Sequence, residues 1–333
     1  MKRVICIFFG VILLSGCSRT GKEDAYSRTA ALMDTFVQVK VAAPGRDRAE
    51  LAKAADRALG RARELEKKFS IFDPESEVNA LNIAGVRTTS PELFDLVMKA
   101  SKAGRITDGE FDITVAPVLK ADGFYGNMPA EIRDRIPEGF SGVGWKNVTL
   151  DPAGRSITLH NGAWIDLSGI AKGYIVDQMS AFLRNEGIEV FLINAGGDIY
   201  CGTGKKSGDW KIGVRRPGAL NIAVTLSIRN MAVATSGDYE NVIVDGNTGK
   251  IVSHIIDPSV DEARREIPSS VTVIASTCTE ADALATGMMA MGREKAIALA
   301  DTMDGVSIIA IECPGGQEKV SFSGGAAEYL AER

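Results

Sequence analysis

Four stretches of the sequence carry side chains whose types and spacing could do chemistry, and the first is DLSGIAKG at residues 166–173. An expected strand ends there in the carboxylate of Asp166, a turn of small residues follows, and an expected helix begins with Lys172. The N–H groups at a helix start bind anions, and the lysine adds positive charge. The spacing therefore indicates an anion site, although an ordinary strand–helix turn with a solvated lysine explains it equally well.

The second stretch, TEADALATG at residues 279–287, is an expected helix that carries Asp282 and Thr286. Residues four apart lie on one face of a helix. A carboxylate and a hydroxyl, joined by a backbone carbonyl, suit a hard divalent ion that keeps some of its waters, such as Mg²⁺. Taken alone, the pattern favours a plainer interpretation, a helix start whose acidic residues stabilise the helix dipole.

The other two stretches carry weaker signals. HIIDP at residues 254–258 places His254 before an Asp-Pro turn, where a histidine can face a ligand but is more often a satisfied core or turn residue. GEFDIT at residues 109–114 joins a glycine turn to an aromatic ring and carboxylates, or simply starts a strand. The chain has no GxGxxG after a first strand, no P-loop motif and no GxSxG, so dinucleotide-binding, P-loop and nucleophile-elbow interpretations lack their main support.

Composition narrows the partners and the metal chemistry. Of the 333 residues, 45% are hydrophobic and 24% are charged, which is ordinary for a folded protein. Lys and Arg total 38 against 43 Asp and Glu, and no dense basic stretch occurs, so nucleic acid is not an expected partner. Only two histidines are present, so a bound metal must rely largely on oxygen ligands.

The chain begins like an exported protein. A basic MKR start precedes an apolar run, about half as long as a membrane-spanning helix, that ends in LSGC and is similar to a bacterial lipobox. We therefore expect a signal peptide over residues 1–16, a lipidated Cys17 with a tether over 17–30, and a folded unit over 31–333. A plain signal peptide with a chance cysteine is the alternative. The expected location is a membrane surface on the periplasmic, extracytoplasmic side, held by the lipid anchor.

The pattern of apolar residues predicts an α+β fold of mixed, largely antiparallel sheets with packed helices, because hairpins join many of the strands. Two similar hairpin–strand–helix units hint at a duplicated unit. Residues 120–145 are expected to form an exposed excursion, and Cys201, Cys278 and Cys313 to be buried thiols. Helices are predicted over 47–69, 90–103, 171–185 and 279–291, and strands over 35–41, 148–150, 156–159, 163–167, 189–194, 241–244, 250–255, 270–275 and 306–311.

Taken together and in order, these stretches closely resemble the ApbE family of FAD:protein FMN transferases. The similarity covers nearly all of the chain after the expected signal peptide, and family members are commonly exported lipoproteins. The matching segments are Met33-Asp34-Thr35-Phe36, Phe69 to Phe72 with Ser76-Glu77, Gly109 to Thr114, Asp166 to Gly173, Asn194 to Asp198, Ala234 to Gly237, His254 to Pro258 and Asp282 to Gly287.

The resemblance implies a reaction and its participants. FAD is split at its pyrophosphate, FMN is joined through a phosphoester to a threonine or serine of a target protein, and AMP leaves. The targets are subunits of membrane redox complexes, such as sodium-pumping quinone reductase and Rnf-type complexes. The resemblance also implies a Mg²⁺ ion held by the carbonyl of Gly169 and the side chains of Asp282 and Thr286. The residues that it places around FAD are Met33, Phe72, Glu110, Phe111, Asp112, Asp166, Lys172, His254 and Ile256.

Catalysis of this reaction depends on charge and on a base. Pyrophosphate cleavage builds negative charge on phosphate oxygens, which Lys172 and the metal would stabilise. His254 and Asp257 are the candidates for the base that accepts the proton of the incoming hydroxyl. The family often has tyrosine where Phe72 stands, and alanine or serine where Gly169 stands. Phe72 can stack on a ring but cannot donate a hydrogen bond, whereas a carbonyl ligand is indifferent to the second change.

Two other functions fit the same stretches. One is a metal-dependent FAD pyrophosphatase, which would use water as acceptor and release FMN and AMP. The other is a non-enzymatic lipoprotein that binds and stores FAD. The pairing of Asp282 and Thr286 with residues 166–173 favours chemistry over storage, because storage requires no metal.

Overall fold

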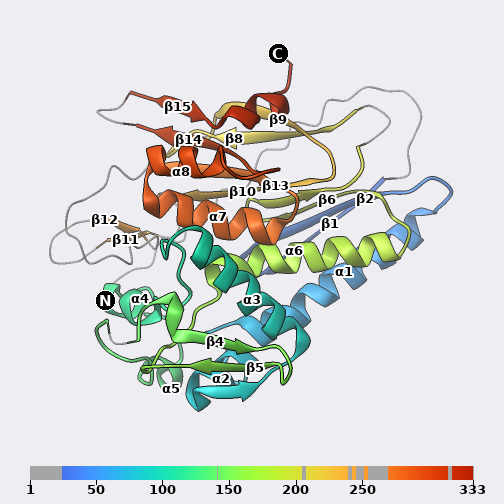
Figure 1. Ribbon diagram of the computed structural model, residues 1–333. Coiled ribbons are helices and arrows are strands. Elements are labelled where there is room, and N and C mark those ends of the chain that lie inside the picture. Colours follow the sequence, from blue (N-terminus) through green and yellow to red (C-terminus); the bar gives the residue numbers. More distant parts are fainter. Residues whose placement is uncertain are drawn as a thin grey trace.

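An eight-stranded sheet forms the centre of the molecule, and every pairing within it is antiparallel (Figure 1). The structure is a computed structural model that describes residues 25–140, 142–204, 208–238, 242–244, 251–253, 269–313 and 317–332, with the backbone alone for 242–244 and 251–253. In sheet order the strands are β1 (Ala25–Leu32), β2 (Thr35–Ala42), β6 (Val190–Ala195), β7 (Asp198–Cys201), β10 (Met231–Gly237), β13 (Ser270–Ala275), β14 (Ser307–Glu312) and β15 (Lys319–Phe322).

Helices cover one face of this sheet and a two-stranded sheet covers the other (Figure 1). Because successive strand residues point to opposite faces, Val273 of β13 packs in the helical core whereas Ile274 packs against β8 (Trp210–Arg215) and β9 (Ile222–Ile228). The helices are α1 (Arg48–Phe69), α2 (Glu77–Ala84), α3 (Pro91–Ile106), α4 (Ala116–Asp122), α5 (Ala130–Arg133), α6 (Ser168–Asn185), α7 (Cys278–Met291) and α8 (Arg293–Ala300), with the 3₁₀ turns η1 (Trp145–Asn147) and η3 (Gly324–Tyr329).

Two smaller sheets complete the fold. The strands β3 (Val86–Thr88), β5 (Ser156–Leu159) and β4 (Val148–Asp151) pair in that order, and β11 (Val242–Val244) pairs with β12 (Ile251–Ser253). Both hairpins predicted from the sequence are therefore present. Together with the antiparallel central sheet, they confirm the α+β prediction.

Local sequence signals explain where the long helices begin. The Asp47 side chain accepts from the N–H of Glu50, whose own side chain accepts from the N–H of Asp47, so a capping box starts α1. The Ser90 side chain accepts from the N–H of Leu93, and Pro91 follows at the first position of α3. Both starts lie where the sequence predicts them.

The prediction of a strand over 163–167 is wrong, because this segment pairs with no strand. Its backbone is bonded instead by the side chain of Asn82, whose Nδ2 donates to the carbonyl of Ile165 at 2.9 Å and whose Oδ1 accepts from the N–H of Ile165 at 2.8 Å. The next amide, that of Asp166, donates to the carbonyl of Ile113 at 2.7 Å.

The prediction that residues 120–145 form an exposed excursion is also wrong. Apolar side chains of this region make a separate small core around Trp164. The members from this region are Tyr125, Met128, Ile132 and Ile136. The Gly, Pro and charged residues between them hid this pattern, because a core built from scattered side chains has no helix or strand period.

Two further expectations differ from the structure. Strand β1 covers residues 25–32 and pairs along its length with β2, so residues 25–30 belong to the sheet rather than to a tether. Cys201 and Cys278 are buried as expected, but Cys313 is exposed beyond the end of β14.

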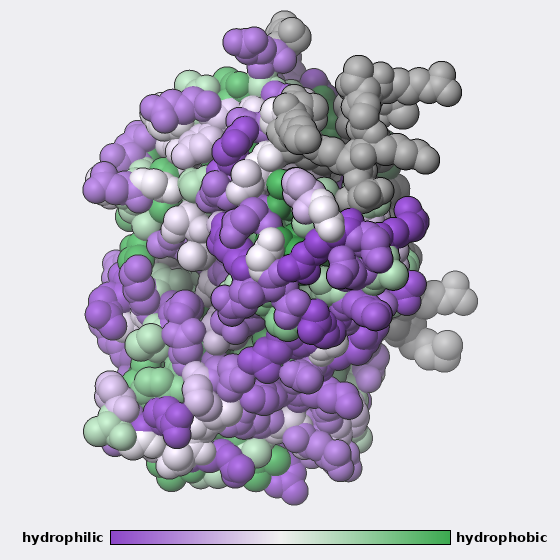
Figure 2. All heavy atoms as spheres, turned by 90° about the vertical axis from the view of Figure 1, so that its right-hand side faces the viewer, coloured by the Kyte–Doolittle hydropathy of each residue, from purple (hydrophilic) through white to green (hydrophobic). Residues whose placement is uncertain are grey.

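One side of the surface shows no large apolar area outside its grey atoms (Figure 2). Figure 2 shows that the side on which α6 ends is mostly hydrophilic, with hydrophobic side chains in small separate areas. Within the described ranges, no helix combines the length and apolar character that crossing a membrane requires.

Candidate active site

Several turns that carry predicted site residues lie at one edge of the central sheet, among the described residues. The turn at Met33 precedes β2, and the turn at Gly196 joins β6 to β7, next to the pairing of Val37 with Ala195. A Cβ on Gly196 would lie 2.5 Å from Oγ1 of Thr35, so the two turns touch. Strand β10 ends and β13 begins at this same edge, because the antiparallel register runs on from β7 through β10.

Helices α6 and α7 pack very closely beside this edge. The N–H of Gly173 on α6 donates to Oδ2 of Asp282 on α7 at 2.9 Å. A Cβ on Gly173 would lie 2.3 Å from the carbonyl oxygen of Cys278, which no side chain tolerates. One turn earlier on α6, a Cβ on Gly169 would lie 3.8 Å from Oγ1 of Thr286. The structure thus brings together Gly169, Asp282 and Thr286, the three predicted metal ligands.

These three residues fit a hard cation. The Asp282 carboxylate is buried, and Gly173 bonds only its Oδ2 in the described contacts. In a regular helix the N–H of Gly173 bonds the carbonyl of Gly169. A carbonyl oxygen has two lone pairs, so the Gly169 carbonyl keeps capacity for another partner. Oγ1 of Thr286 lies 3.2 Å from Oγ of Ser236, the last-but-one residue of β10. Carboxylate, carbonyl and hydroxyl oxygens are a donor set that Mg²⁺ accepts.

Charge at the site is partly balanced. Burial, and next the nearby carboxylate of Asp198, raise the pKa of Asp282 to about 7, whereas the charge of Lys172 lowers it. Nζ of Lys172 lies 2.5 Å from Oδ2 of Asp198, whose side chain is 2% exposed. A buried carboxylate of this kind is stabilised by a cation, so the site can take up more positive charge than Lys172 alone supplies.

Asp166 is held firmly at the start of α6. Tyr125 donates from its hydroxyl to Oδ2 of Asp166 at 2.6 Å, and Ser168 donates to Oδ1 from its N–H at 2.8 Å and from its hydroxyl at 2.5 Å. Both oxygens of the carboxylate are therefore engaged. Burial, followed by the charge of Asp166, raises the pKa of Tyr125 well above its usual value, so the phenol stays protonated and remains a donor.

Within the stretch from Gly109 to Thr114, some side chains line a cavity and others pack in the core. Glu110 and Asp112 line a cavity of about 440 Å³ together with Trp145 and Lys146. Oδ1 of Asp112 accepts from both the N–H and the hydroxyl of Thr114, but burial outweighs these bonds and raises the pKa of this carboxyl.

Phe111 points the other way. Its ring lies 3.3 Å from the position of a Cβ on Gly169, and its own Cβ lies 2.9 Å from that of a Cβ on Gly287. Phe111 therefore packs where α6 and α7 meet, between the cavity and the predicted metal ligands.

Met33 and Phe72 pack against different cores, Met33 against the main helical core and Phe72 against the small core around Trp164. Met33 has a left-handed backbone, with φ of 54°, and its N–H donates to Oε1 of Glu66 on α1 at 2.6 Å. The ring of Phe72 meets that of Tyr125 edge to face, with the centroids 5.9 Å apart. Because Tyr125 bonds Asp166, the aromatic pair connects Phe72 to the start of α6.

Four predicted residues lie outside the described residues: the lipidation site Cys17, and His254, Ile256 and Asp257. After these three residues the described chain resumes at the site edge, where the carbonyl of Ser269 accepts from the N–H of Asp238 at 3.1 Å and Ser270 pairs with Gly237.

Sequence reasoning missed three residues of this site. Asp198 and Ser236 belong to two of the segments that match the ApbE family, but nothing in those segments indicates that Asp198 pairs with Lys172 or that Ser236 meets Thr286. Tyr125 has no local pattern at all. A single sequence carries no signal for such long-range partners.

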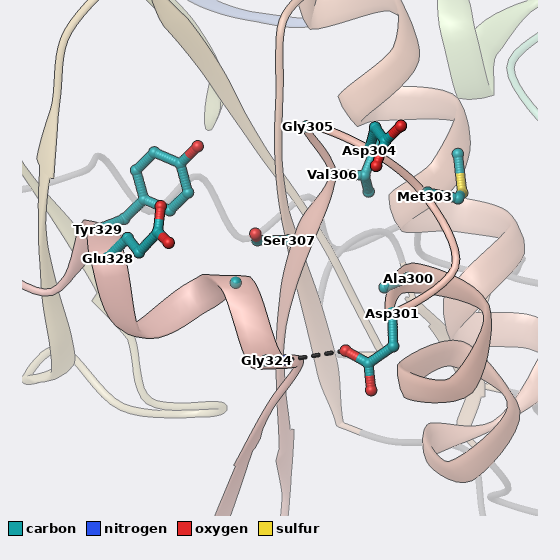
Figure 3. Close-up of a pocket in the computed structure, with 11 residues that line it drawn as sticks. Ala300, Asp301, Met303, Asp304, Gly305, Val306, Ser307, Gly324, Glu328 and Tyr329 are labelled. Carbon is teal, nitrogen blue, oxygen red and sulfur yellow. Dashed lines mark hydrogen bonds between the residues drawn. The ribbon is translucent and has the colours of Figure 1, made fainter.

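A second cavity lies elsewhere and contains none of the predicted residues. It measures about 410 Å³ and opens between η3 and the connection from α8 to β14, where the N–H of Gly324 donates to Oδ1 of Asp301 at 2.8 Å (Figure 3). Its lining includes Asp304, Ser307 and Tyr329. It is separate from the site built by α6 and α7.

A helix start, a lysine and buried carboxylates lie together at one edge of the antiparallel sheet. This combination suits a phosphate-containing ligand and a divalent cation. Comparison with known proteins identifies the protein family, because the family model described as "ApbE family" matches residues 33–310. The chain belongs to the ApbE family. This membership confirms the resemblance seen in the sequence and the prediction that the chain is an enzyme.

Relatives and solved structures agree with this membership. A FAD:protein FMN transferase of Vibrio cholerae serotype O1 is 29% identical over 318 residues, which are 90% of this chain and 91% of that protein. One of Klebsiella pneumoniae is 31% identical over 284 residues, 82% of this chain and 84% of that protein. The ApbE protein of Thermotoga maritima matches with a TM-score of 0.81 at 30% identity, over 92% of this chain and 100% of that chain. The flavin transferase ApbE from Vibrio cholerae matches with a TM-score of 0.74 at 26% identity, over 92% of this chain and 99% of that chain.

Proposed function

We propose that this protein transfers FMN from FAD to a threonine or serine hydroxyl of a target protein, in a Mg²⁺-dependent reaction that releases AMP. The names of its relatives support the flavin transfer. The metal, the acceptor residue and the leaving AMP are our extension: the family resemblance implies all three, and the residues of the site fit the metal.

One observation carries the proposal: Gly169, Asp282 and Thr286 converge where α6 and α7 meet. An enzyme that splits a pyrophosphate must neutralise the charge that builds on the phosphate oxygens. A metal ion held by these three residues would supply that charge stabilisation. Storage of FAD would require no such group of ligands.

The transfer exchanges one bond at phosphorus for another. The acceptor hydroxyl oxygen forms a bond to the phosphorus of the FMN half, the bond from that phosphorus to the bridging oxygen breaks, and AMP leaves with the bridging oxygen. The proton of the hydroxyl goes to a base, for which His254 and Asp257 are the candidates. Lys172, at the start of α6, adds positive charge beside the phosphates.

The same site accounts for the binding of the rest of FAD. Met33, Phe72 and Ile256 supply apolar surface, and Glu110 and Asp112 supply polar groups at a cavity large enough for a flat ring. We further propose that Cys17 carries a lipid anchor that holds the protein at the membrane on the extracytoplasmic side. Subunits of membrane redox complexes, of the quinone reductase or Rnf type, would be the targets there.

The test is to incubate the full-length protein with FAD, Mg²⁺ and a candidate target subunit. We expect a covalently fluorescent target band on a denaturing gel and a target mass increased by one FMN. The Asp282→Ala variant should lose the band, whereas Asp301→Ala, at the other cavity, should keep it. An unchanged yield in Asp282→Ala would overturn the proposal. FMN and AMP formed equally fast without the target would indicate a pyrophosphatase, and tight FAD binding without turnover would indicate storage.

A further inference from the structure

Asp177 lies on the face of α6 that carries Gly169 and Gly173. The three residues are spaced four apart, so they line up along the helix. The same face contacts α7, and α7 runs in the opposite direction. Gly169 meets Thr286, Gly173 meets Asp282, and Asp177 meets Cys278.

Asp177 binds the start of α7 through both carboxylate oxygens. Its Oδ1 accepts from the N–H of Cys278 at 2.8 Å. Its Oδ2 accepts from the N–H of Thr279 at 2.8 Å and from the hydroxyl of Thr279 at 2.5 Å. The first N–H groups of a helix have no partner within it, and a carboxylate is the best acceptor for them.

Helix α7 does not need Asp177 as its local cap. The side chain of Thr277 already caps α7 by accepting from the N–H of Glu280. Asp177 comes from another helix, about a hundred residues away in sequence. It accepts from the N–H groups of Cys278 and Thr279, which the Thr277 side chain does not bond. Its contacts therefore fix where α7 starts relative to α6.

That position decides the geometry of the proposed metal ligands. Asp282 lies one turn beyond Cys278 on α7, and Thr286 lies one turn further. The glycines at 169 and 173 allow the two backbones to touch but supply no side chain that would prevent α7 from sliding along α6. Apart from the bond between Gly173 and Asp282 at the proposed metal site itself, Asp177 supplies the charged bonds between these helices that resist such sliding in the described contacts.

We propose that Asp177 is a positioning residue, which holds α7 in register with α6 so that the Asp282 carboxylate and the Thr286 hydroxyl meet the Gly169 carbonyl around one divalent cation. This inference rests on the proposed function, since that function supplies the cation. It assigns a role to a residue that touches neither the cation nor FAD.

The test measures cation binding directly, with neither FAD nor a target present. Isothermal titration calorimetry with Mg²⁺, and electron paramagnetic resonance with Mn²⁺, compare the wild type with Asp177→Asn and Asp177→Ala. We expect binding to weaken about tenfold or more in Asp177→Ala, as is usual when a partner outside the ligand set is lost. Asp177→Asn, which keeps one acceptor oxygen, should lie in between. In transfer assays, saturating Mg²⁺ should restore most of kcat while KM for FAD stays within about twofold.

The matched control is Asp47→Ala, which removes a carboxylate cap from α1, away from the site. It should lower the unfolding temperature but leave the Mg²⁺ affinity unchanged. If Asp177→Ala does not fold, Thr279→Val removes one of the three bonds and should weaken Mg²⁺ binding by a smaller factor. Wild-type Mg²⁺ affinity in the Asp177 variants would overturn the positioning role alone. A wild type that binds neither Mg²⁺ nor Mn²⁺ would overturn this inference and the metal part of the proposed function together.

Discussion

The amide of Gly173 on α6 donates to the carboxylate of Asp282 on α7 at 2.9 Å, and α6 contributes no side chain at this contact. The approach depends on the missing Cβ, which would lie 2.3 Å from the carbonyl oxygen of Cys278 and 2.8 Å from Cβ of Asp282. Both neighbours belong to the rigid start of α7, so neither can move aside as the end of a flexible side chain could.

Gly173→Ala should therefore separate α6 from α7. We expect a loss of about 1–3 kcal/mol in the free energy of unfolding, typical of an overpacked core, and loss of flavin transfer even where the protein stays folded. Urea unfolding and the fluorescent-band assay measure the two effects. Gly60→Ala is the control, because nothing lies within 4 Å of a Cβ at this position on α1. It should raise stability by up to about 1 kcal/mol and leave transfer intact. Full transfer by Gly173→Ala would contradict this account of the site.

The pair of Lys172 and Asp198 gives a second prediction. Lys172→Met should destabilise the protein by about 1–3 kcal/mol, because the carboxylate of Asp198 is left buried without its charged partner. The double variant Lys172→Met with Asp198→Asn should regain much of this stability, since the buried charge is gone. Both variants should bind FAD at least several-fold more weakly, because the charge beside the phosphates is missing. Chemical unfolding and an FAD titration separate the effects, and a double variant with wild-type FAD affinity would show that Lys172 does not contact the phosphates.

Much of the fold could be predicted from the sequence because its signals are local. Ser90 and Pro91 mark the start of α3, and the apolar run from Ser270 to Ala275 matches β13 at both ends. The predicted ligands Asp282 and Thr286 followed from a four-residue spacing and from the family resemblance, and the structure places them on one helix face beside Gly169.

The failures around the site share one physical cause, a partner that is distant in the sequence. The run before Asp166 looks like a strand, yet its hydrogen-bonding partner is the side chain of Asn82, 83 residues away from Ile165. Tyr125 lies among turn residues and joins the site only because the chain folds back onto Asp166. Asp177 shows no sign in the sequence of its contact with α7.

Tyr125→Phe gives a third prediction. The variant removes the donor to Oδ2 of Asp166 and leaves the ring in place against Phe72. We expect a stability loss of about 1–2 kcal/mol and a several-fold rise in KM for FAD, because the Asp166 carboxylate is then less firmly held. Tyr174→Phe is the matched control, since Tyr174 is likewise buried on α6, and burial, followed by the charge of Asp95 on α3, raises its pKa. It should lose stability to a similar extent with KM unchanged. Equal KM values in the two variants would show that Tyr125 has no part in FAD binding.

Acid sensitivity gives a fourth prediction, located at Glu92 in the first turn of α3. Oε1 of Glu92 lies 2.7 Å from Nη2 of Arg61, and Oε2 lies 3.2 Å from Nζ of Lys68, so the carboxylate ties α3 to α1. The hydrogen bond from Arg61, opposed by burial, lowers the pKa of Glu92 from 4.5 to about 2. The folded state therefore binds this proton more weakly than the unfolded state does. The stabilisation is complete above pH 4.5 and is lost as the pH falls toward 2.

Glu92→Gln should accordingly lower the free energy of unfolding by about 1 kcal/mol at pH 7, a modest value because the pair is partly exposed to solvent. The difference between wild type and variant should shrink as the pH is lowered from 5 to 3, which urea unfolding at a series of pH values measures. Glu294→Gln is the control, because Glu294 pairs with Arg293 while its side chain is 85% exposed, so little stability should change at any pH. A wild-type advantage over Glu92→Gln that stays constant down to pH 3 would place the acid-sensitive group elsewhere, since only protonation of the Glu92 carboxylate removes its bonds to α1.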